Sequence, residues 1–137
     1  CDYYSDEYAL ITDEGHVRPF PRALRDRPNP YSFVYTPAVD LGWSPDFRPE
    51  PVALVAALVY EPDSTLRLTE VSKAEGIIRL LEHTVCAQPA PKLSLDRLEK
   101  CTSYCPVFHG VRGEKDPAAD ALLDMAQKLQ CKENLST

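Results

Sequence analysis

Cysteine is the residue type whose spacing in this sequence most directly indicates chemistry. Four of the five cysteines, Cys86, Cys101, Cys105 and Cys131, lie in the C-terminal half, and the fifth is Cys1. Residues at positions i and i+4 of a helix share one face, with Cβ atoms about 5–6 Å apart, whereas a disulfide needs Cβ atoms about 3.8 Å apart. Cys101 and Cys105 should therefore bond to different partners rather than to each other. If the three helices alternate in direction, the second begins beside Cys86 and Cys131, so we expect Cys101 to pair with one of these and Cys105 to reach farther, with Cys1 as a candidate partner.

A zinc site is the competing interpretation of these residues. His83 together with Cys86, Cys101 and Cys105 supplies one imidazole and three sulfurs, which a structural zinc ion accepts. Tetrahedral thiolate sites usually draw their ligands from tight loops, whereas these residues lie in segments with helical patterns. We therefore favour disulfides, and we expect neither a metal nor a cofactor.

The sequence gives little support for a catalytic activity. Cys105 and His109 have the residue types of a thiolate and its general base, but Pro106 lies between them and no orienting group is evident. No nucleophile elbow, phosphate-binding glycine loop or His-Glu-x-x-His motif is present. The prediction is a protein that is not an enzyme and has no catalytic residues.

An odd number of cysteines leaves one without an intramolecular partner, and three interpretations remain open. The remaining cysteine is a buried thiol, forms an intermolecular disulfide, or is a Cys1 that carries another group. A chain that starts at cysteine resembles a bacterial lipoprotein after removal of its signal peptide, which implies a lipid anchor at Cys1. The sequence from Asn134 to Ser136 is an N-glycosylation sequon.

These features together predict the compartment. Disulfides persist in oxidising surroundings, and a chain that starts at Cys1 rather than Met is expected to have lost a signal peptide. We expect a secreted or cell-surface glycoprotein, with a periplasm-like compartment as the alternative. Reduced, buried cysteines in the cytosol remain the competing interpretation.

Composition limits the classes of partner. The chain has 137 residues, of which 44% are hydrophobic and 26% charged, and its formal net charge is −6. Binding to nucleic acid or to an anionic membrane begins with a basic surface, so we expect neither and predict a protein partner with a basic surface. The longest apolar run, from Val52 to Tyr60, is shorter than the roughly 20 residues that a transmembrane helix needs.

The first half of the chain has the patterns of β-structure interrupted by proline. Eight of the thirteen prolines lie between Pro19 and Pro51. Residues 8–12 and 16–20 have strand composition around a turn with Gly15. Residues 31–35 alternate aromatic and other residues, so the aromatic ones would share one face of a strand. The apolar run ending at Tyr60 and the alternating residues 65–70, joined through a turn with Pro62, predict a hairpin.

The second half has three helical patterns. Ser72 and Glu75 form a capping box at the start of the first helix. Ser94 is expected to cap the second helix, which Pro106 ends. Asp116 is expected to cap the third helix, with Pro117 at its first position. The predicted apolar stripe of this third helix consists of Ala119, Leu122, Leu123, Ala126 and Leu129.

The predicted fold is α+β: an antiparallel sheet from the N-terminal half, covered on one face by about three disulfide-linked C-terminal helices. We expect a single domain over residues 1–137. It would comprise an acidic Tyr-rich arm at 1–8, a Pro-rich β region at 9–71 and a helical region at 72–137.

Aromatic and arginine residues of the first half are the candidate contacts with a partner, because tyrosine, tryptophan and arginine dominate binding energy at protein interfaces. The predicted function is therefore a non-enzymatic protein-binding module. A carrier of a small apolar ligand is the alternative, and a cysteine-dependent hydrolase ranks below it. The candidate binding residues are Tyr3, Tyr4, Tyr8, Arg22, Arg25, Arg27, Trp43 and Phe47.

Overall fold

The computed structural model describes residues 4, 8–20, 22–29, 31–42 and 48–133, with only the backbone described at 26–28 and 130–133. The chain divides into two compact units, unit 1 at Cys1–Pro51 and unit 2 at Val52–Thr137. The single domain expected from the chain length stays a prediction, because two compact units can belong to one domain.

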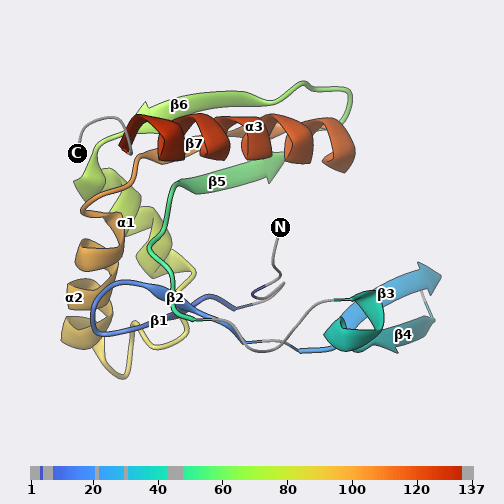
Figure 1. Cartoon of the computed structure of the whole chain (residues 1–137), viewed down its shortest axis with the longest axis horizontal. Coiled ribbons are helices and arrows are strands. Elements are labelled where there is room, and N and C mark those ends of the chain that lie inside the picture. The colour runs from blue at the N-terminus through green and yellow to red at the C-terminus, as the bar shows by residue number, and fades with distance from the viewer. Residues whose placement is uncertain (1–3, 5–7, 21, 30, 43–47, 134–137) are drawn as a thin grey trace. The chain divides into compact units, whose positions relative to one another are not determined.

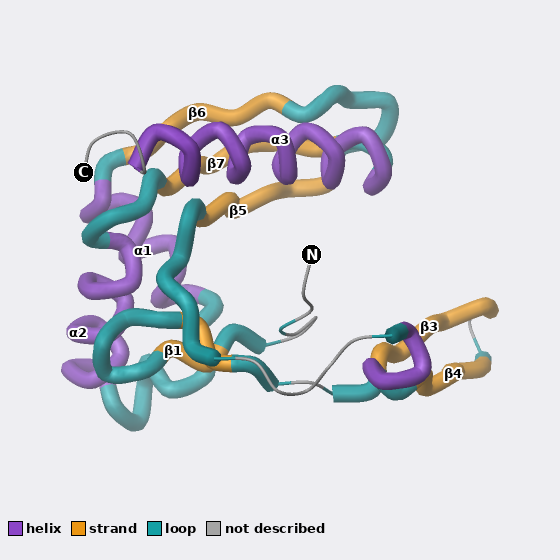
Figure 2. Tube along the Cα trace, viewed as in Figure 1, coloured by secondary structure: helices purple, strands orange, loops and turns teal. Residues whose placement is uncertain are grey.

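Unit 1 contains two small antiparallel sheets and one turn of 3-10 helix, η1 (Figures 1 and 2). The strands β1 and β2 confirm the predicted short pair, and Gly15 between them has a φ of 85°, which favours glycine. Thr12 stabilises this turn, since its Oγ1 accepts from the amides of Glu14 and His16. The elements of unit 1 are β1 (Leu10–Ile11), β2 (Val17–Arg18), β3 (Leu24–Asn29), β4 (Ser32–Thr36) and η1 (Ala38–Leu41).

Unit 2 contains a three-stranded mixed sheet in the order β5-β7-β6. Its strands are β5 (Val55–Tyr60), β6 (Arg67–Val71) and β7 (Val107–Arg112). The central strand β7 is parallel to β5 and antiparallel to β6. The predicted hairpin of β5 with β6 is therefore wrong, and so is an antiparallel sheet built from the N-terminal half alone, because β7 comes from the region predicted to be helical.

Two glycines allow β7 and the residue that follows it to lie very close to the backbone of neighbouring segments. A Cβ atom added at Gly110 would lie 1.9 Å from the carbonyl oxygen of Arg67 on β6. A Cβ atom at Gly113 would lie 1.9 Å from the carbonyl oxygen of Ser64. Backbone oxygens cannot move aside as a flexible side chain can, so glycine is required at both positions.

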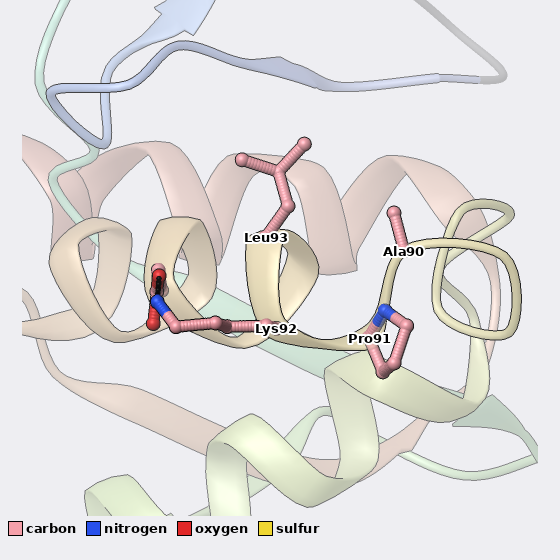
Figure 3. Close-up of a pocket in the computed structure, with 5 residues that line it drawn as sticks. Ala90, Pro91, Lys92 and Leu93 are labelled. Carbon is pink, nitrogen blue, oxygen red and sulfur yellow. Dashed lines mark hydrogen bonds and ion pairs between the residues drawn. The ribbon is translucent and has the colours of Figure 1, made fainter.

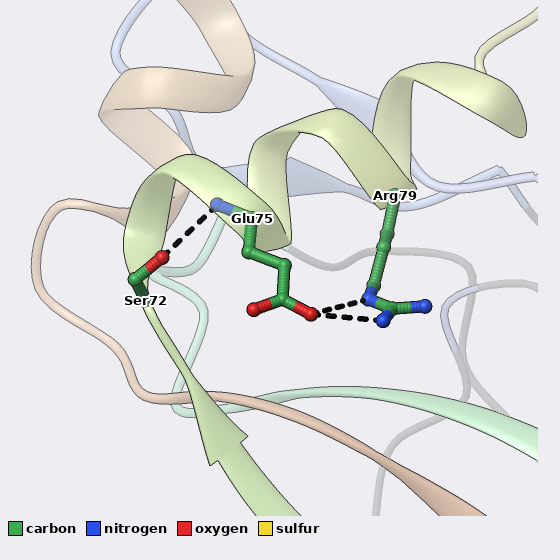
Figure 4. Close-up of polar contacts among 3 residues, drawn as sticks. All are labelled: Ser72, Glu75 and Arg79. Carbon is green, nitrogen blue, oxygen red and sulfur yellow. Dashed lines mark hydrogen bonds and ion pairs between the residues drawn. The ribbon is translucent and has the colours of Figure 1, made fainter.

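Three helices belong to unit 2, as predicted: α1 (Lys73–Glu82), α2 (Pro91–Thr102) and α3 (Lys115–Glu133). Ser72 caps α1, because its Oγ accepts from the amide of Glu75 at 3.2 Å (Figure 4). The Glu75 carboxylate pairs with Arg79 one turn later, at 2.8 Å. The helix start is thus confirmed, and the Glu75 side chain stabilises the helix through this i, i+4 pair.

The second helix begins earlier than predicted. Pro91 occupies the first turn of α2, and Ser94 is buried within the helix rather than at its start. Proline is well suited to this position, because its missing N–H would have no partner in a first turn. The helix ends at Thr102, so Cys105 lies beyond it.

The apolar stripe of α3 also differs from the predicted one. Leu122, Ala126 and Leu129 are half-buried, as predicted, whereas Ala119 and Leu123 are exposed. Ala118, which is buried, and Met125, which is half-buried, complete the less exposed face in their place. An amphipathic pattern locates a helix better than the exact residues that it buries.

The core of unit 2 forms where α1 and α2 meet the start of β7. α1 contacts both α2 and β7. A Cβ atom at Gly76 of α1 would lie 2.7 Å from Cγ1 of the buried Val107, so the helix lies directly on the strand. Thr102 has no exposed surface, and its hydroxyl donates to the carbonyl oxygen of Leu98 at 2.9 Å.

Candidate binding surface

The most exposed aromatic cluster in the described part of the chain lies on the hairpin of β3 and β4. Arg25 lies opposite Tyr35, and Leu24 lies opposite Thr36. Alternate residues of a strand face the same side, so Phe33 and Tyr35 share one face with Arg25. The Arg25 guanidinium stacks over the Phe33 ring, 4.9 Å from its centroid. This face thus presents two rings and one cation together.

The turn of the hairpin presents a third ring. Tyr31 is 96% exposed. The Asn29 side chain fixes the turn locally, because its Oδ1 accepts from the Tyr31 amide at 3.0 Å. We call Arg25, Tyr31, Phe33 and Tyr35 the aromatic hairpin surface.

The exposed fractions of these rings distinguish this surface from a core. Tyr35 is 63% exposed and Phe33 is 43% exposed, so much of their apolar area remains in contact with water. A ring stacked with arginine can contribute about 0.5–1 kcal/mol at an exposed site and more when a partner excludes water. The arrangement therefore suits recognition better than it suits stabilisation of the fold.

The structure places some of the predicted binding residues elsewhere. Tyr4 is held to other segments of unit 1, since its hydroxyl donates to the carbonyl oxygen of Arg48 at 2.7 Å. Its own carbonyl oxygen accepts from the amide of Phe20 at 2.9 Å. Tyr8 is 45% exposed. The acidic arm is therefore bonded to the rest of unit 1 at Tyr4.

Only one of the eight predicted binding residues, Arg25, belongs to the aromatic hairpin surface. Arg22 is exposed and precedes β3. Arg27 lies on β3, but its side chain is outside the described residues. Tyr3, Trp43 and Phe47 also fall outside them. The signal for Phe33 and Tyr35 was the alternation of aromatic residues between 31 and 35, which indicates a shared strand face.

The predicted disulfides are not present at the cysteines that the structure describes. Cys86, Cys101 and Cys105 form no disulfide. The prediction that disulfides link the helices is therefore not realised among these three. Cys131 lies on α3 with its side chain outside the described residues, and Cys1 is outside them as well.

Helix geometry explains why Cys86 and Cys101 do not meet. Cys101 lies ten residues after Pro91, the start of α2, which places it about 15 Å along the helix. The ammonium group of Lys73, at the start of α1, donates to the carbonyl oxygen of Ser103, just after the end of α2. Cys86 lies in the connection at the opposite ends of both helices. A disulfide needs Cα atoms within about 7 Å.

Cys101 and Cys105 instead pack together inside unit 2. Both residues are buried, and the Cys105 thiol contacts the carbonyl oxygen of Cys101 at 3.4 Å. Burial, with a smaller contribution from Cys105, raises the pKa of the Cys101 thiol to about 11. A thiol held in its neutral form is a poor nucleophile and a poor metal ligand.

An open depression lies at the start of α2 (Figure 3). Its volume is about 420 Å³, and its lining consists of Ala90, Pro91, Lys92, Leu93 and Asp96. Lys92 donates to Asp96 at 2.7 Å, and this bond raises the pKa of Lys92. A carrier would hold its ligand in an enclosed apolar cavity, and this depression is open to solvent.

Among the described residues, no group of three or more histidine, cysteine, aspartate or glutamate side chains gathers in a way that could hold a metal ion. None of the helices described is both long enough and apolar enough to cross a membrane.

Comparison with known proteins identifies no relative. No protein-family model, no curated protein and no solved structure matches this chain significantly.

Proposed function

We propose that this chain is a non-enzymatic protein-binding module and that the aromatic hairpin surface contacts its partner. One observation carries this proposal: Tyr31 and Tyr35 are 96% and 63% exposed on the hairpin that also holds the Arg25–Phe33 stack. Tyrosine and arginine are enriched among the residues that dominate interface energies. Their side chains offer large contact areas, together with polar groups that can hydrogen-bond to a partner.

The partner is proposed to be a protein with a basic surface, since the chain carries a net charge of −6. At the hairpin itself, the Arg25 guanidinium adds hydrogen-bond donors suited to a carboxylate or a carbonyl oxygen. The proposed location is extracellular or at the cell surface, on the grounds of the sequon at Asn134.

A photo-crosslinking experiment tests the proposed surface. p-Benzoylphenylalanine replaces Tyr31 in the full chain, which is then irradiated with secreted and surface proteins of the source organism. The control carries the same group at Tyr104, which lies in unit 2 and is 87% exposed. We expect one dominant crosslinked partner at position 31, weaker in the Arg25→Ser or Phe33→Ser background, and no such product at position 104. Equal products at both positions would contradict the proposal.

A mass measurement tests the proposed location separately. Intact mass and non-reducing peptide mapping of the protein from its native source report a lipid at Cys1, a glycan at Asn134 and any intermolecular disulfide. We expect at least one of these modifications. Five reduced cysteines without lipid or glycan would rule out the extracellular assignment and leave the binding surface to the crosslinking test.

A further inference from the structure

The described part of each unit contains an arginine that stacks on an aromatic ring of a neighbouring strand. In unit 2 the guanidinium of Arg112 on β7 lies over the ring of Tyr60 on β5, 5.3 Å from its centroid. In unit 1 the guanidinium of Arg25 on β3 lies over the ring of Phe33 on β4, 4.9 Å from its centroid. In both units the residue directly opposite the arginine in the strand register is a tyrosine, Tyr60 in unit 2 and Tyr35 in unit 1. The two stacks can therefore be compared group by group.

The stack in unit 2 is completed by a carboxylate of the same chain. The Tyr60 hydroxyl donates to Oε1 of Glu114 at 3.1 Å. Nη1 of Arg112 donates to the carbonyl oxygen of Gly113 at 2.9 Å. A carboxylate accepts hydrogen bonds from a phenol and is attracted to a guanidinium. In this molecule an acidic side chain thus already binds beside an arginine and a tyrosine that are paired across two strands.

The stack in unit 1 has the same kinds of donor and no such acceptor among the described residues. Apart from its contact with the Phe33 ring, the Arg25 guanidinium makes no hydrogen bond or ion pair with a described residue. The Tyr35 hydroxyl also makes none with the described residues, and Tyr35 is 63% exposed. A guanidinium stacked on a ring keeps its N–H donors in its own plane, where they can hold a carboxylate through two hydrogen bonds. The hairpin therefore has donors for an acidic group that the described part of the chain does not supply.

The charge of the hairpin is opposite in sign to that of the whole chain. Residues 22–36 contain three arginines and one aspartate, which gives this segment a formal charge of +2, whereas the chain carries −6. Electrostatic complementarity therefore favours an acidic segment over a basic one at this hairpin. The basic surface proposed for the partner would face other, acidic parts of this chain.

We propose that the aromatic hairpin surface binds an acidic segment of the partner protein, and that Arg25 and Tyr35 bind an aspartate or glutamate carboxylate of that segment. This inference rests on the proposed function, because it assigns a ligand chemistry to the surface proposed there. The partner's carboxylate would have the role at Tyr35 that Glu114 has at Tyr60 in unit 2. The exposed ring of Tyr31 provides contact area for the residues that flank the carboxylate.

Selection from a library of random peptides tests this ligand chemistry without knowledge of the partner. The full chain is the target, and the affinity of each selected peptide is measured by fluorescence anisotropy. We expect aspartate and glutamate to be enriched over the starting library. Replacing the acidic residues of a selected peptide by asparagine and glutamine should weaken binding about tenfold or more, because neutral amides lose the charge-assisted hydrogen bonds. High salt should also weaken binding.

A matched pair of variants tests whether the acidic peptide binds at the hairpin. Arg25→Ser removes the stacked guanidinium and should weaken peptide binding about tenfold or more. Arg67→Ser removes the same charge from an exposed side chain of unit 2, which pairs with Glu61 at 3.1 Å, and should leave peptide binding unchanged. Arg25→Lys keeps the charge but loses the planar set of donors, so its affinity should lie between those of Arg25→Ser and the wild type.

Three results overturn the inference. The first is a selection in which aspartate and glutamate are not enriched, including one that yields no peptide. The second is an acidic peptide that binds Arg25→Ser as tightly as it binds the wild type. The third is a set of amide chemical-shift changes, on titration of the unaltered chain with the peptide, that is confined to unit 2. This last measurement decides the matter even if a variant fails to fold.

Failure of this inference can be distinguished from failure of the proposed function. One dominant crosslinked partner at position 31, together with no enrichment of acidic peptides, would overturn the inference and leave the proposed function in place. Equal crosslinking at positions 31 and 104 would contradict the proposed function even where acidic peptides bind the hairpin.

Discussion

The two larger sheets of this protein differ in whether their side chains are exposed to solvent or packed against a helix. The β3–β4 sheet of unit 1 has two strands and exposes the rings of Phe33 and Tyr35. The β5-β7-β6 sheet of unit 2 has a central strand, and α1 lies on that strand at Val107. A two-stranded hairpin alone has little stability, and a third strand or a packed helix supplies what it lacks. We infer that unit 2 carries most of the stability and unit 1 most of the recognition.

The largest expected effect is a substitution at the centre of the unit 2 sheet. Gly110→Ala would place a methyl group 1.9 Å from the carbonyl oxygen of Arg67, so β6 and β7 must separate. We expect a loss of about 3 kcal/mol in the free energy of unfolding, measured by urea denaturation.

A glycine of unit 1 is the matched control for this substitution. Gly42 has a φ of 78° but open space around its Cα, so Gly42→Ala meets only backbone strain. We expect a cost of about 1 kcal/mol. Equal losses for both variants would contradict the assignment of stability to unit 2.

The next effect concerns pH and the buried thiols. The pKa of Cys101 is about 11 in the folded protein, against 9.0 for the ordinary thiol. Because the folded state favours the protonated thiol, this contribution to stability is complete below pH 9 and is lost as the pH rises towards 11.

Denaturation of the wild type and of Cys101→Ala across this pH window measures the effect. We expect the stability of the wild type to fall by about 1–2 kcal/mol more than that of the variant between pH 9 and 11. Hydrogen exchange of peptides from each unit should locate the loss in unit 2. Parallel pH curves for the two proteins would show that Cys101 does not titrate as described.

A smaller effect is expected at the start of α1. Ser72→Ala removes the oxygen that accepts from the Glu75 amide, which should cost about 1 kcal/mol. Arg79→Ala removes the pair with Glu75 and should cost about 0.3–0.5 kcal/mol, because that pair is exposed. Thermal unfolding followed by circular dichroism measures both, and a larger loss for Arg79→Ala would reverse our ranking.

The smallest effect on stability should come from the aromatic hairpin surface. Tyr31→Ser combined with Tyr35→Ser removes two exposed rings, so the free energy of unfolding should change by about 0.5 kcal/mol or less. Binding to the crosslinked partner should weaken at least tenfold, measured by titration calorimetry. A large loss of stability with unchanged binding would contradict this assignment, because the aromatic hairpin surface would then stabilise the fold and not bind the partner.

Local patterns predicted local elements well. The capping box located the start of α1, the strand composition around Gly15 located β1 and β2, and the apolar run before Pro62 located β5. These features depend on residues close together in the chain, where backbone hydrogen bonds and side-chain caps are decided locally. The alternation between residues 31 and 35 likewise indicated the strand face that now forms part of the candidate site.

Long-range pairing could not be obtained in the same way. Val107–Arg112 is a short segment between two helical patterns, and nothing nearby in the sequence indicates that it separates β5 from β6. Loop closure between distant segments depends on the packing of the whole unit. The pairing of the cysteines could not be predicted for the same reason. The i, i+4 spacing of Cys101 and Cys105 indicates only how these two residues lie relative to each other, whereas their distance from Cys86 depends on the antiparallel arrangement of α1 and α2.

The sequence by itself determined the α+β class, the three helices and the uncharged run that becomes β5. Only the tertiary structure decided that β7 is central, that Cys101 and Cys105 are packed as buried thiols, and that Arg25 stacks on Phe33. The physical reason is the range of the interactions. Hydrogen bonds within a turn or a helix are specified by neighbours in sequence, whereas sheet order and burial depend on which distant surfaces fit together.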